Sequence, residues 1–226
     1  MRELPDSSID MILCDLPYGT TDCSWDVVIP FEPLWSQYKR IIKGNGAVVL
    51  FSAQPFTTDL INSNRRNYRY SWYWKKNNKT GALNCKRQPL RCVEDISVFY
   101  CKQPVYNPQG LIRLDKPVLN KADNKTPLWR GKKNDSLQLY TNYPNHLLEF
   151  AKDPDHMHPT QKPVSLLEYL IRTYTDEGDT VLDNCMGSGS TGVACLNAKR
   201  RFIGMEADEK YFRIAQERLE IFQNQL

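Results

Sequence analysis

The chain has 226 residues, of which 41% are hydrophobic and 25% are charged, with a net charge of +4. This length suffices for one well-buried domain carrying a small insertion, and the composition is ordinary for a globular protein. No apolar run approaches the roughly 18 residues that span a bilayer, and no signal peptide is recognisable, so we expect a cytoplasmic protein. The seven cysteines include no C-x-x-C pair, which predicts reduced, mostly buried thiols and no metal site.

Apolar runs and helical spacing alternate along most of the chain. In chain order, the expected elements are strand 9–13, helix 31–42, strand 47–51, helix 56–61, strands 68–74 and 93–100, helix 163–174, strand 180–183, a helix through 193–196, strand 201–206 and helix 209–222. This alternation predicts an α/β fold with a doubly wound, mostly parallel sheet of six strands.

The basic residues are concentrated in one segment. Between residues 64 and 92 there are nine basic residues and no acid, so the rest of the chain is net acidic. Aromatic residues are interleaved with the first of these charges, between Tyr68 and Trp74. Basic side chains neutralise phosphates and aromatic rings stack on unpaired bases, which favours nucleic-acid binding. A solvated loop that follows an aromatic core strand is the alternative interpretation.

Residues 102–157 differ from the rest of the chain. This stretch is rich in Asn, Pro, Lys and Asp and shows no sustained periodicity. We interpret it as an insertion or a small recognition module.

A glycine-rich loop joins the strand 180–183 to the next helix. Gly187, Gly189 and Gly192 match G-x-G-x-x-G, and Glu206 follows at the distance of a ribose-binding acid, so a nicotinamide dehydrogenase is one interpretation. A tight turn without a ligand is another. Asp183 favours a third, because its carboxylate suits the ammonium and sulfonium of S-adenosylmethionine and repels a pyrophosphate.

The first strand ends in the tetrapeptide Asp15-Leu16-Pro17-Tyr18. An aromatic exocyclic amine is a poor nucleophile because its lone pair is delocalised into the ring. Hydrogen-bond acceptors on the amino hydrogens redirect that lone pair, and Asp15 and the Leu16 carbonyl are suitable acceptors. Tyr18 offers a face on which a flipped base can stack. The alternative is a purely structural role, in which the aspartate caps a turn.

With both loops in view, the sequence resembles the amino-DNA methyltransferases (N6-adenine/N4-cytosine) of the permuted β class, in which the catalytic motif precedes the cofactor motif. Their D/S-P-P-Y motif is matched by residues 15–18, with Leu16 in place of proline, and their H-P-T-x-K-P segment by residues 158–163. The resemblance implies the Rossmann-like fold of S-adenosylmethionine-dependent methyltransferases. It also implies a cofactor site formed by Asp183, Cys185, Gly187, Ser188, Gly189, Glu206, His158, Thr160, Lys162 and Pro163.

The resemblance divides the chain into a catalytic part (1–101), a target-recognition insertion (102–157) and a cofactor-binding part (158–226). Its basic loop, 75–91, would grip double-stranded DNA with a flipped target base. The DNA-binding side chains expected there are Lys75, Lys76, Lys79, Lys86, Arg87 and Arg91. The resemblance also makes a homodimer plausible.

The resemblance implies site-specific DNA methylation, of the kind found in restriction-modification systems. Asp rather than Ser at position 15 favours adenine over cytosine as the methylated base. Cytosine-N4 methylation, an RNA or protein-glutamine methyltransferase and a non-catalytic DNA-binding relic remain alternatives. Family members usually carry another strand upstream, whose acid contacts the cofactor's adenine, so we expect either a lost strand or weakened cofactor affinity.

Overall fold

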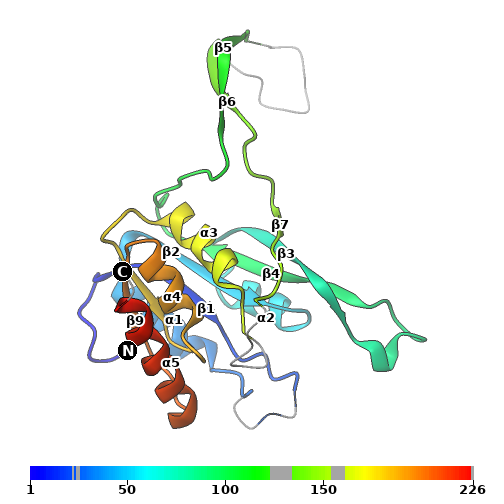
Figure 1. Ribbon diagram of the computed structural model, residues 1–226, viewed down its shortest axis with the longest axis vertical. Coiled ribbons are helices and arrows are strands. Elements are labelled where there is room, and N and C mark those ends of the chain that lie inside the picture. The colour runs from blue at the N-terminus through cyan, green and yellow to red at the C-terminus, as the bar shows by residue number, and fades with distance from the viewer. Residues whose placement is uncertain (22, 24–25, 123–133, 154–160, 225–226) are drawn as a thin grey trace. The chain divides into compact units, whose positions relative to one another are not determined.

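The computed structural model describes the whole chain except residues 22, 24–25, 123–133, 154–160 and 225–226 (Figure 1). The chain forms two compact units, one made of residues 1–107 and 146–226 and the other of residues 108–145. Among the described residues, no helix is long and apolar enough to cross a membrane.

The larger unit is built on one sheet, which contains seven strands within the described residues, in the order β7-β3-β4-β2-β1-β8-β9. The strands are β1 (Ile9–Asp15), β2 (Ile42–Ser52), β3 (Tyr68–Thr80), β4 (Arg91–Phe99), β7 (Leu147–Glu149), β8 (Thr180–Asp183) and β9 (Arg201–Gly204). Four neighbouring pairs are parallel, and β4 is antiparallel to both β2 and β3. The mostly parallel sheet is therefore confirmed.

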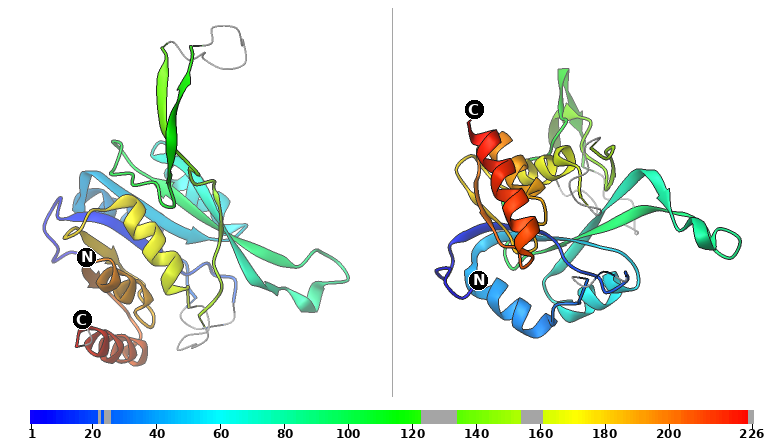
Figure 2. Two further views of the ribbon diagram at one scale, coloured as in Figure 1. Left: turned by 45° about the horizontal axis from the view of Figure 1, so that its top comes forward. Right: turned by 60° about the horizontal axis from the view of Figure 1, so that its bottom comes forward.

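Helices cover both faces of this sheet (Figures 1 and 2). They are α1 (Phe31–Ile41), α2 (Phe56–Ser63), α3 (Val164–Tyr174), α4 (Ser190–Asn197) and α5 (Glu209–Gln223). Apolar residues of α1 and α2 pack in one core cluster, and those of α3 and α4 in a second, on the other face. Because both faces are covered, the central strands contain long apolar runs, and residues 46–52 of β2 are all buried. The doubly wound arrangement expected from the sequence is confirmed.

The segment expected to be a basic loop, residues 75–91, begins as part of a β-ribbon and continues as the loop that closes it. Strand β3 continues past Trp74 to Thr80, β4 begins at Arg91, and Thr80 pairs with Arg91. A short 3₁₀ helix, Ala82–Asn84, closes the end of the ribbon. Figure 2 shows the two strands leaving the sheet together. The expectation of a basic loop was wrong for residues 75–80, which extend β3, because exposed polar residues give no signal of a buried strand, whereas residues 81–90 do lie between the two strands.

The seventh strand comes from the segment in which the sequence predicts no element. Strand β7 has only three residues, and Tyr73 of β3 pairs with Leu147 of β7 in parallel. The expected count of six strands was therefore one too low. This additional strand lies at the β3 edge of the sheet, and β9 forms the opposite edge.

The smaller unit, residues 108–145, lies within the segment interpreted as an insertion. Its described part is an antiparallel pair of strands, β5 (Ile112–Asn120) and β6 (Ser136–Thr141). Ile112 pairs with Thr141 and Asn120 with Ser136.

Candidate active site

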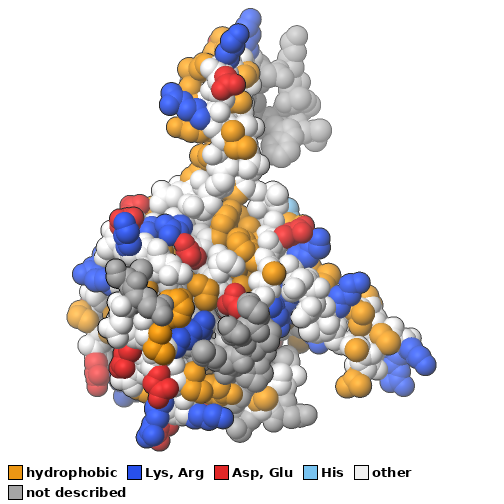
Figure 3. Space-filling model, viewed as in Figure 1, with side chains coloured by type: hydrophobic (Ala, Val, Ile, Leu, Met, Phe, Trp, Pro, Cys, Tyr) orange, Lys and Arg blue, Asp and Glu red, His pale blue; other side chains and the backbone are white. Residues whose placement is uncertain are grey.

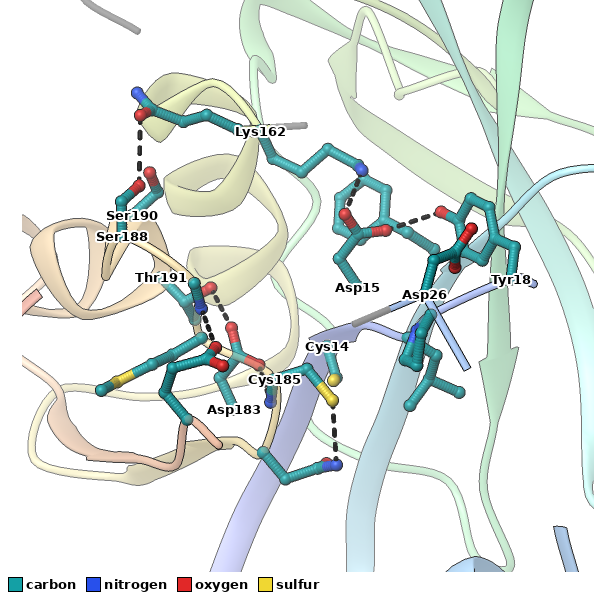
Figure 4. Close-up of a pocket in the computed structure, with 18 of the residues that line it drawn as sticks. Cys14, Asp15, Tyr18, Asp26, Lys162, Asp183, Cys185, Ser188, Ser190 and Thr191 are labelled. Atoms are coloured by element: carbon teal, nitrogen blue, oxygen red, sulfur yellow. Dashed lines mark hydrogen bonds and ion pairs between the residues drawn. The ribbon is translucent and has the colours of Figure 1, made fainter. Parts of the chain in front are cut away.

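The two motifs of the sequence meet at one edge of the sheet. Strands β1 and β8 are parallel neighbours, so their carboxyl ends, Asp15 and Asp183, lie at the same edge. A pocket of about 560 Å³ opens there and is lined by residues 14–18 and 183–188 (Figure 4). Ligands of open α/β sheets bind at the carboxyl ends of the strands, so this pocket is the candidate active site.

Both oxygens of the Asp15 carboxylate have partners. The Tyr18 hydroxyl donates to Oδ1 at 2.6 Å, and the Lys162 ammonium donates to Oδ2. The Tyr18 ring stacks on Phe56 of α2, with 5.3 Å between ring centroids. Burial raises the pKa of the Tyr18 hydroxyl well above its usual value, and the neighbouring Asp15 adds to this effect. The Tyr18 hydroxyl is therefore a neutral hydrogen-bond donor. Its hydrogen bond and that of Lys162 together fix the orientation of the Asp15 carboxylate.

The backbone after the tetrapeptide is held by a second aspartate. The Asp26 carboxylate accepts hydrogen bonds from the backbone N–H groups of Gly19, Thr20 and Thr21, at 2.8–2.9 Å. Burial acts to raise the pKa of Asp26, but these donors outweigh it and lower the pKa. Asp26 therefore stabilises the loop that carries Tyr18 without itself being an acid or base.

On the other side of the pocket, Asp183 organises the glycine-rich loop. Its carboxylate accepts the backbone N–H of Cys185 at 3.0 Å and the hydroxyl of Thr191 at 2.6 Å. Burial raises the pKa of Asp183 to about 6, and the hydrogen bond from Thr191 acts against this shift. Asp183 thus ties the strand end to the start of α4, while its side chain also lines the pocket.

Glu206 holds the same loop from the next strand. Its carboxylate accepts the backbone N–H of Gly187 at 2.8 Å and that of Asp208 at 3.0 Å. Each carboxylate oxygen has two lone pairs, so Glu206 retains acceptor capacity toward the pocket that it lines. The Ser188 hydroxyl donates to Gln161 at 3.2 Å, which connects the loop to the segment before α3.

Gly189 is a position of the loop that tolerates a side chain poorly. It has a left-handed φ of +79°, and an added Cβ would lie 3.0 Å from the Cβ of Ala215 in α5. Gly178 has a similar φ of +85°, but an added Cβ would meet nothing within 4 Å. The close approach of residue 189 to α5 therefore depends on its lack of a side chain.

This difference gives a matched pair of variants. Gly178→Ala is expected to lower the free energy of unfolding by roughly 1–2 kcal/mol, the cost of a left-handed residue with a Cβ. Gly189→Ala is expected to lower it further, because the same cost is joined by the contact with Ala215. Urea unfolding of both variants measures the difference. Equal losses of unfolding free energy would show that the loop and α5 can move apart to accommodate the added methyl group.

Most of the expected site residues lie in this pocket. Asp15, Leu16, Pro17 and Tyr18 line it, as do Lys162, Asp183, Cys185, Gly187, Ser188 and Glu206. Gly189 shapes the turn, and Pro163 directly precedes α3. His158 and Thr160 lie outside the described residues. Lys162 contacts Asp15, whereas the resemblance implies a cofactor-binding role for this residue.

Several charged residues of the pocket were not predicted as part of it, and two of them, Glu94 and Lys76, contact each other. Glu94 of β4 was not singled out by the sequence, and Lys76 of β3 was expected on the DNA-binding surface. The Lys76 side chain is only 8% exposed and contacts Glu94 at 2.7 Å. The signal for Lys76 is present in the sequence, because it continues the alternation of the buried residues Trp72 and Trp74.

The donor and acceptor groups indicate which ligands the pocket suits. The glycine-rich loop is surrounded by carboxylates, since Asp183, Glu206 and Asp208 all line this side. Carboxylates accept hydrogen bonds from ammonium and hydroxyl groups, and they repel a pyrophosphate. Within the described ranges, no three His, Cys, Asp or Glu side chains are placed to hold a metal ion. The geometry favours a cationic ligand that carries hydroxyl groups.

Comparisons with known proteins agree with this geometry. Residues 9–217 match the family model N6_N4_Mtase, described as DNA methylase. The chain is 36% identical to the DNA adenine methyltransferase YhdJ of Escherichia coli K12 over 244 residues, covering 98% of this chain and 79% of that protein. It is 27% identical to the type II methyltransferase M.HpaI of Haemophilus parainfluenzae, over 97% of this chain and 71% of that protein.

A solved structure shows the same likeness in three dimensions. The crystal structure of the M1.HpyAVI–SAM complex matches with a TM-score of 0.64 and 26% identity, over 96% of this chain and 91% of that chain. The resemblance inferred from the two motifs is thereby confirmed. Because the family model spans nearly the whole chain, the protein belongs to the DNA methylase family of N6-adenine and N4-cytosine methyltransferases.

Proposed function

We propose that the protein transfers a methyl group from S-adenosylmethionine to the exocyclic amino group of adenine in double-stranded DNA. The observation that carries this proposal is the single pocket shared by the tetrapeptide 15–18 and the loop 183–188. One motif suits an amino group and the other suits a cationic ligand with hydroxyls, so both reactants have a place at the same edge of the sheet. The adenine specificity printed for YhdJ supports adenine as the base.

The glycine-rich side of the pocket is the proposed cofactor site. Glu206 would accept the ribose hydroxyls, while Asp183 and Ser188 would lie toward the aminopropyl tail, where Asp183 faces positive charge. When bound there, S-adenosylmethionine would supply a methyl group on a sulfonium, which would become a neutral thioether once the target amino nitrogen has taken the methyl group. The extra proton of the nitrogen is then released to solvent.

At the other side of the pocket, residues 15–18 would hold the target base. Asp15 accepts one amino hydrogen and the Leu16 carbonyl the other, which directs the nitrogen lone pair toward the cofactor site. The Tyr18 ring stacks on the flipped base, with Phe56 supporting its other side. Catalysis then rests on positioning and a preorganised electrostatic site. Burial raises the pKa of the Cys14 thiol well above its usual value, so this cysteine is a poor nucleophile.

The β3–β4 ribbon is the proposed DNA grip. Figure 3 shows Lys and Arg side chains gathered along its projecting part. The exposed cations are Lys79, Lys86, Arg87 and Arg91. Lys75 is also exposed, but it forms an ion pair with Glu149 at 3.0 Å, and the buried Lys76 is withdrawn from this surface. A two-stranded ribbon of this charge fits a DNA groove, and the unit 108–145 would supply sequence recognition.

Incorporation of labelled methyl groups into unmethylated genomic DNA tests this function. We expect label in DNA that depends on both the chain and S-adenosylmethionine. A chain that binds DNA but transfers no label would favour the non-catalytic alternative. Binding of a nicotinamide dinucleotide in place of S-adenosylmethionine would instead favour the dehydrogenase interpretation of the glycine loop.

A further inference from the structure

Four charged side chains form an alternating row through the pocket. Lys162 lies between two carboxylates, because its ammonium contacts Asp15 and also lies 3.4 Å from Oε2 of Glu94. Glu94 in turn contacts Lys76 through Oε1, at 2.7 Å. The four residues come from the end of β1, the segment before α3, and strands β4 and β3. The row therefore connects four separate parts of the chain and ends at Asp15.

Three of the four side chains in this row are shielded from water. The side chains of Lys162 and Lys76 are each 8% exposed and that of Glu94 is 15% exposed, whereas Asp15 is 24% exposed. Burying an ion is costly unless it is paired, so each of these charges depends on its neighbours. Lys162 is also confined by the ring of Phe51, whose centroid lies 5.2 Å from the ammonium nitrogen. The ammonium consequently has little freedom to leave Asp15.

We propose that Glu94 and Lys162 are positioning residues for methyl transfer, with Glu94 holding the Lys162 ammonium against Asp15 so that the carboxylate keeps one direction toward the target amine. This inference rests on the proposed function. Neither residue needs to touch the cofactor or the base. Lys162 fixes Oδ2 and Tyr18 fixes Oδ1, and each oxygen keeps a second lone pair for an amino hydrogen.

The charge of Lys162 should set the alkaline limit of activity. Burial acts to lower the pKa of Lys162, but the charges of Asp15 and then of Glu94 outweigh it and raise the pKa above its usual value. Among the described residues, the titratable groups that share its partners are Lys76, which also contacts Glu94, and Tyr18, whose neutral hydroxyl also contacts Asp15. Removing the negative charge of Glu94 therefore lowers the pKa of Lys162, and the ammonium deprotonates at a lower pH.

Glu94→Gln tests the proposal, with Glu149→Gln as the matched control. Both substitutions remove a glutamate paired with a β3 lysine, but Glu149 is 64% exposed and lies outside the pocket. In Glu94→Gln we expect kcat to fall about 10- to 100-fold, by analogy with the loss of an outer partner that orients a metal-bound ligand. We also expect the alkaline limb of its pH profile to move to lower pH, with KM for S-adenosylmethionine within about twofold. Glu149→Gln should keep the wild-type kcat and pH profile, because Glu149 and its partner Lys75 lie outside the pocket.

A second variant covers the case in which Glu94→Gln does not fold. Lys76→Met combined with Glu94→Gln removes one positive and one negative charge and leaves Asp15 and Lys162 as a balanced pair. It should still show the lower kcat and the shifted alkaline limb. A wild-type kcat and pH profile in a folded variant would overturn the inference. A wild-type chain that transfers no methyl group to DNA would instead overturn the proposed function itself.

Discussion

Replacing Asp15 by alanine is expected to lower the rate of methyl transfer by at least about 100-fold, the loss typical when one preorganised hydrogen-bonding group is removed from an active site. The substitution removes the acceptor that directs the amino group, and it leaves the Tyr18 hydroxyl and Lys162 ammonium without their shared partner. The glycine-rich loop is held by Asp183 and Glu206 instead, so binding of S-adenosylmethionine should persist. Single-turnover methylation and calorimetric cofactor binding measure the two effects separately.

Asp6→Ala is the matched control for this variant. Asp6 is 74% exposed and forms an ion pair with Arg40 at the surface, away from the pocket lining. Its loss should leave both transfer and cofactor binding close to those of the wild type. An Asp15→Ala variant that retains wild-type transfer would remove Asp15 from the chemistry and contradict the assignment of the tetrapeptide.

Neutralising the β3–β4 ribbon is expected to weaken DNA binding while sparing the cofactor site. A triple variant with Lys79, Lys86 and Arg87 changed to Gln removes three exposed cations from its end. If each contacts a phosphate, the slope of log affinity against log salt should become shallower by about 3, because each contact contributes roughly 0.9 to that slope. Fluorescence anisotropy across a salt series measures this change, and the affinity for S-adenosylmethionine should stay constant.

A second triple variant separates local contacts from overall charge. Lys39, Lys199 and Arg213 are exposed, lie on helices or loops away from the ribbon, and carry the same total charge. Changing them to Gln should alter the salt slope much less. Equal effects of the two triple variants would mean that the ribbon attracts DNA only through the net charge of the chain.

The sequence predicted the two ends of the pocket because each has a strong local signal. An apolar run followed by Asp15 and Pro17 indicates a strand end, and glycines after Asp183 indicate a strand-to-helix turn. The parallel pairing of β1 with β8 then brings the two motifs together, as the alternation of strands and helices predicts. The positions of Asp15 and Glu206 in one pocket thus follow from topology.

Other parts of the site depend on contacts that no local pattern encodes. Glu94 lies in the pocket because it is opposite Trp74 in the antiparallel pair of β3 and β4. This register cannot be predicted from the sequence of either strand. Strand β7 was missed because three residues are too few to show a periodicity. The ribbon was predicted as a loop because its strands have no buried face beyond Lys76. Long-range pairing, rather than propensity, decides all three features.

The most direct test of the account is to identify the base that carries the methyl group. Unmethylated genomic DNA is incubated with the wild-type chain and labelled S-adenosylmethionine, digested to nucleosides and separated, with Asp15→Ala run in parallel. The account predicts label in 6-methyladenine with the wild type and essentially none with the variant. Label in 4-methylcytosine would contradict the choice of base, and DNA that stays unlabelled by a chain that binds the cofactor would contradict the proposed activity.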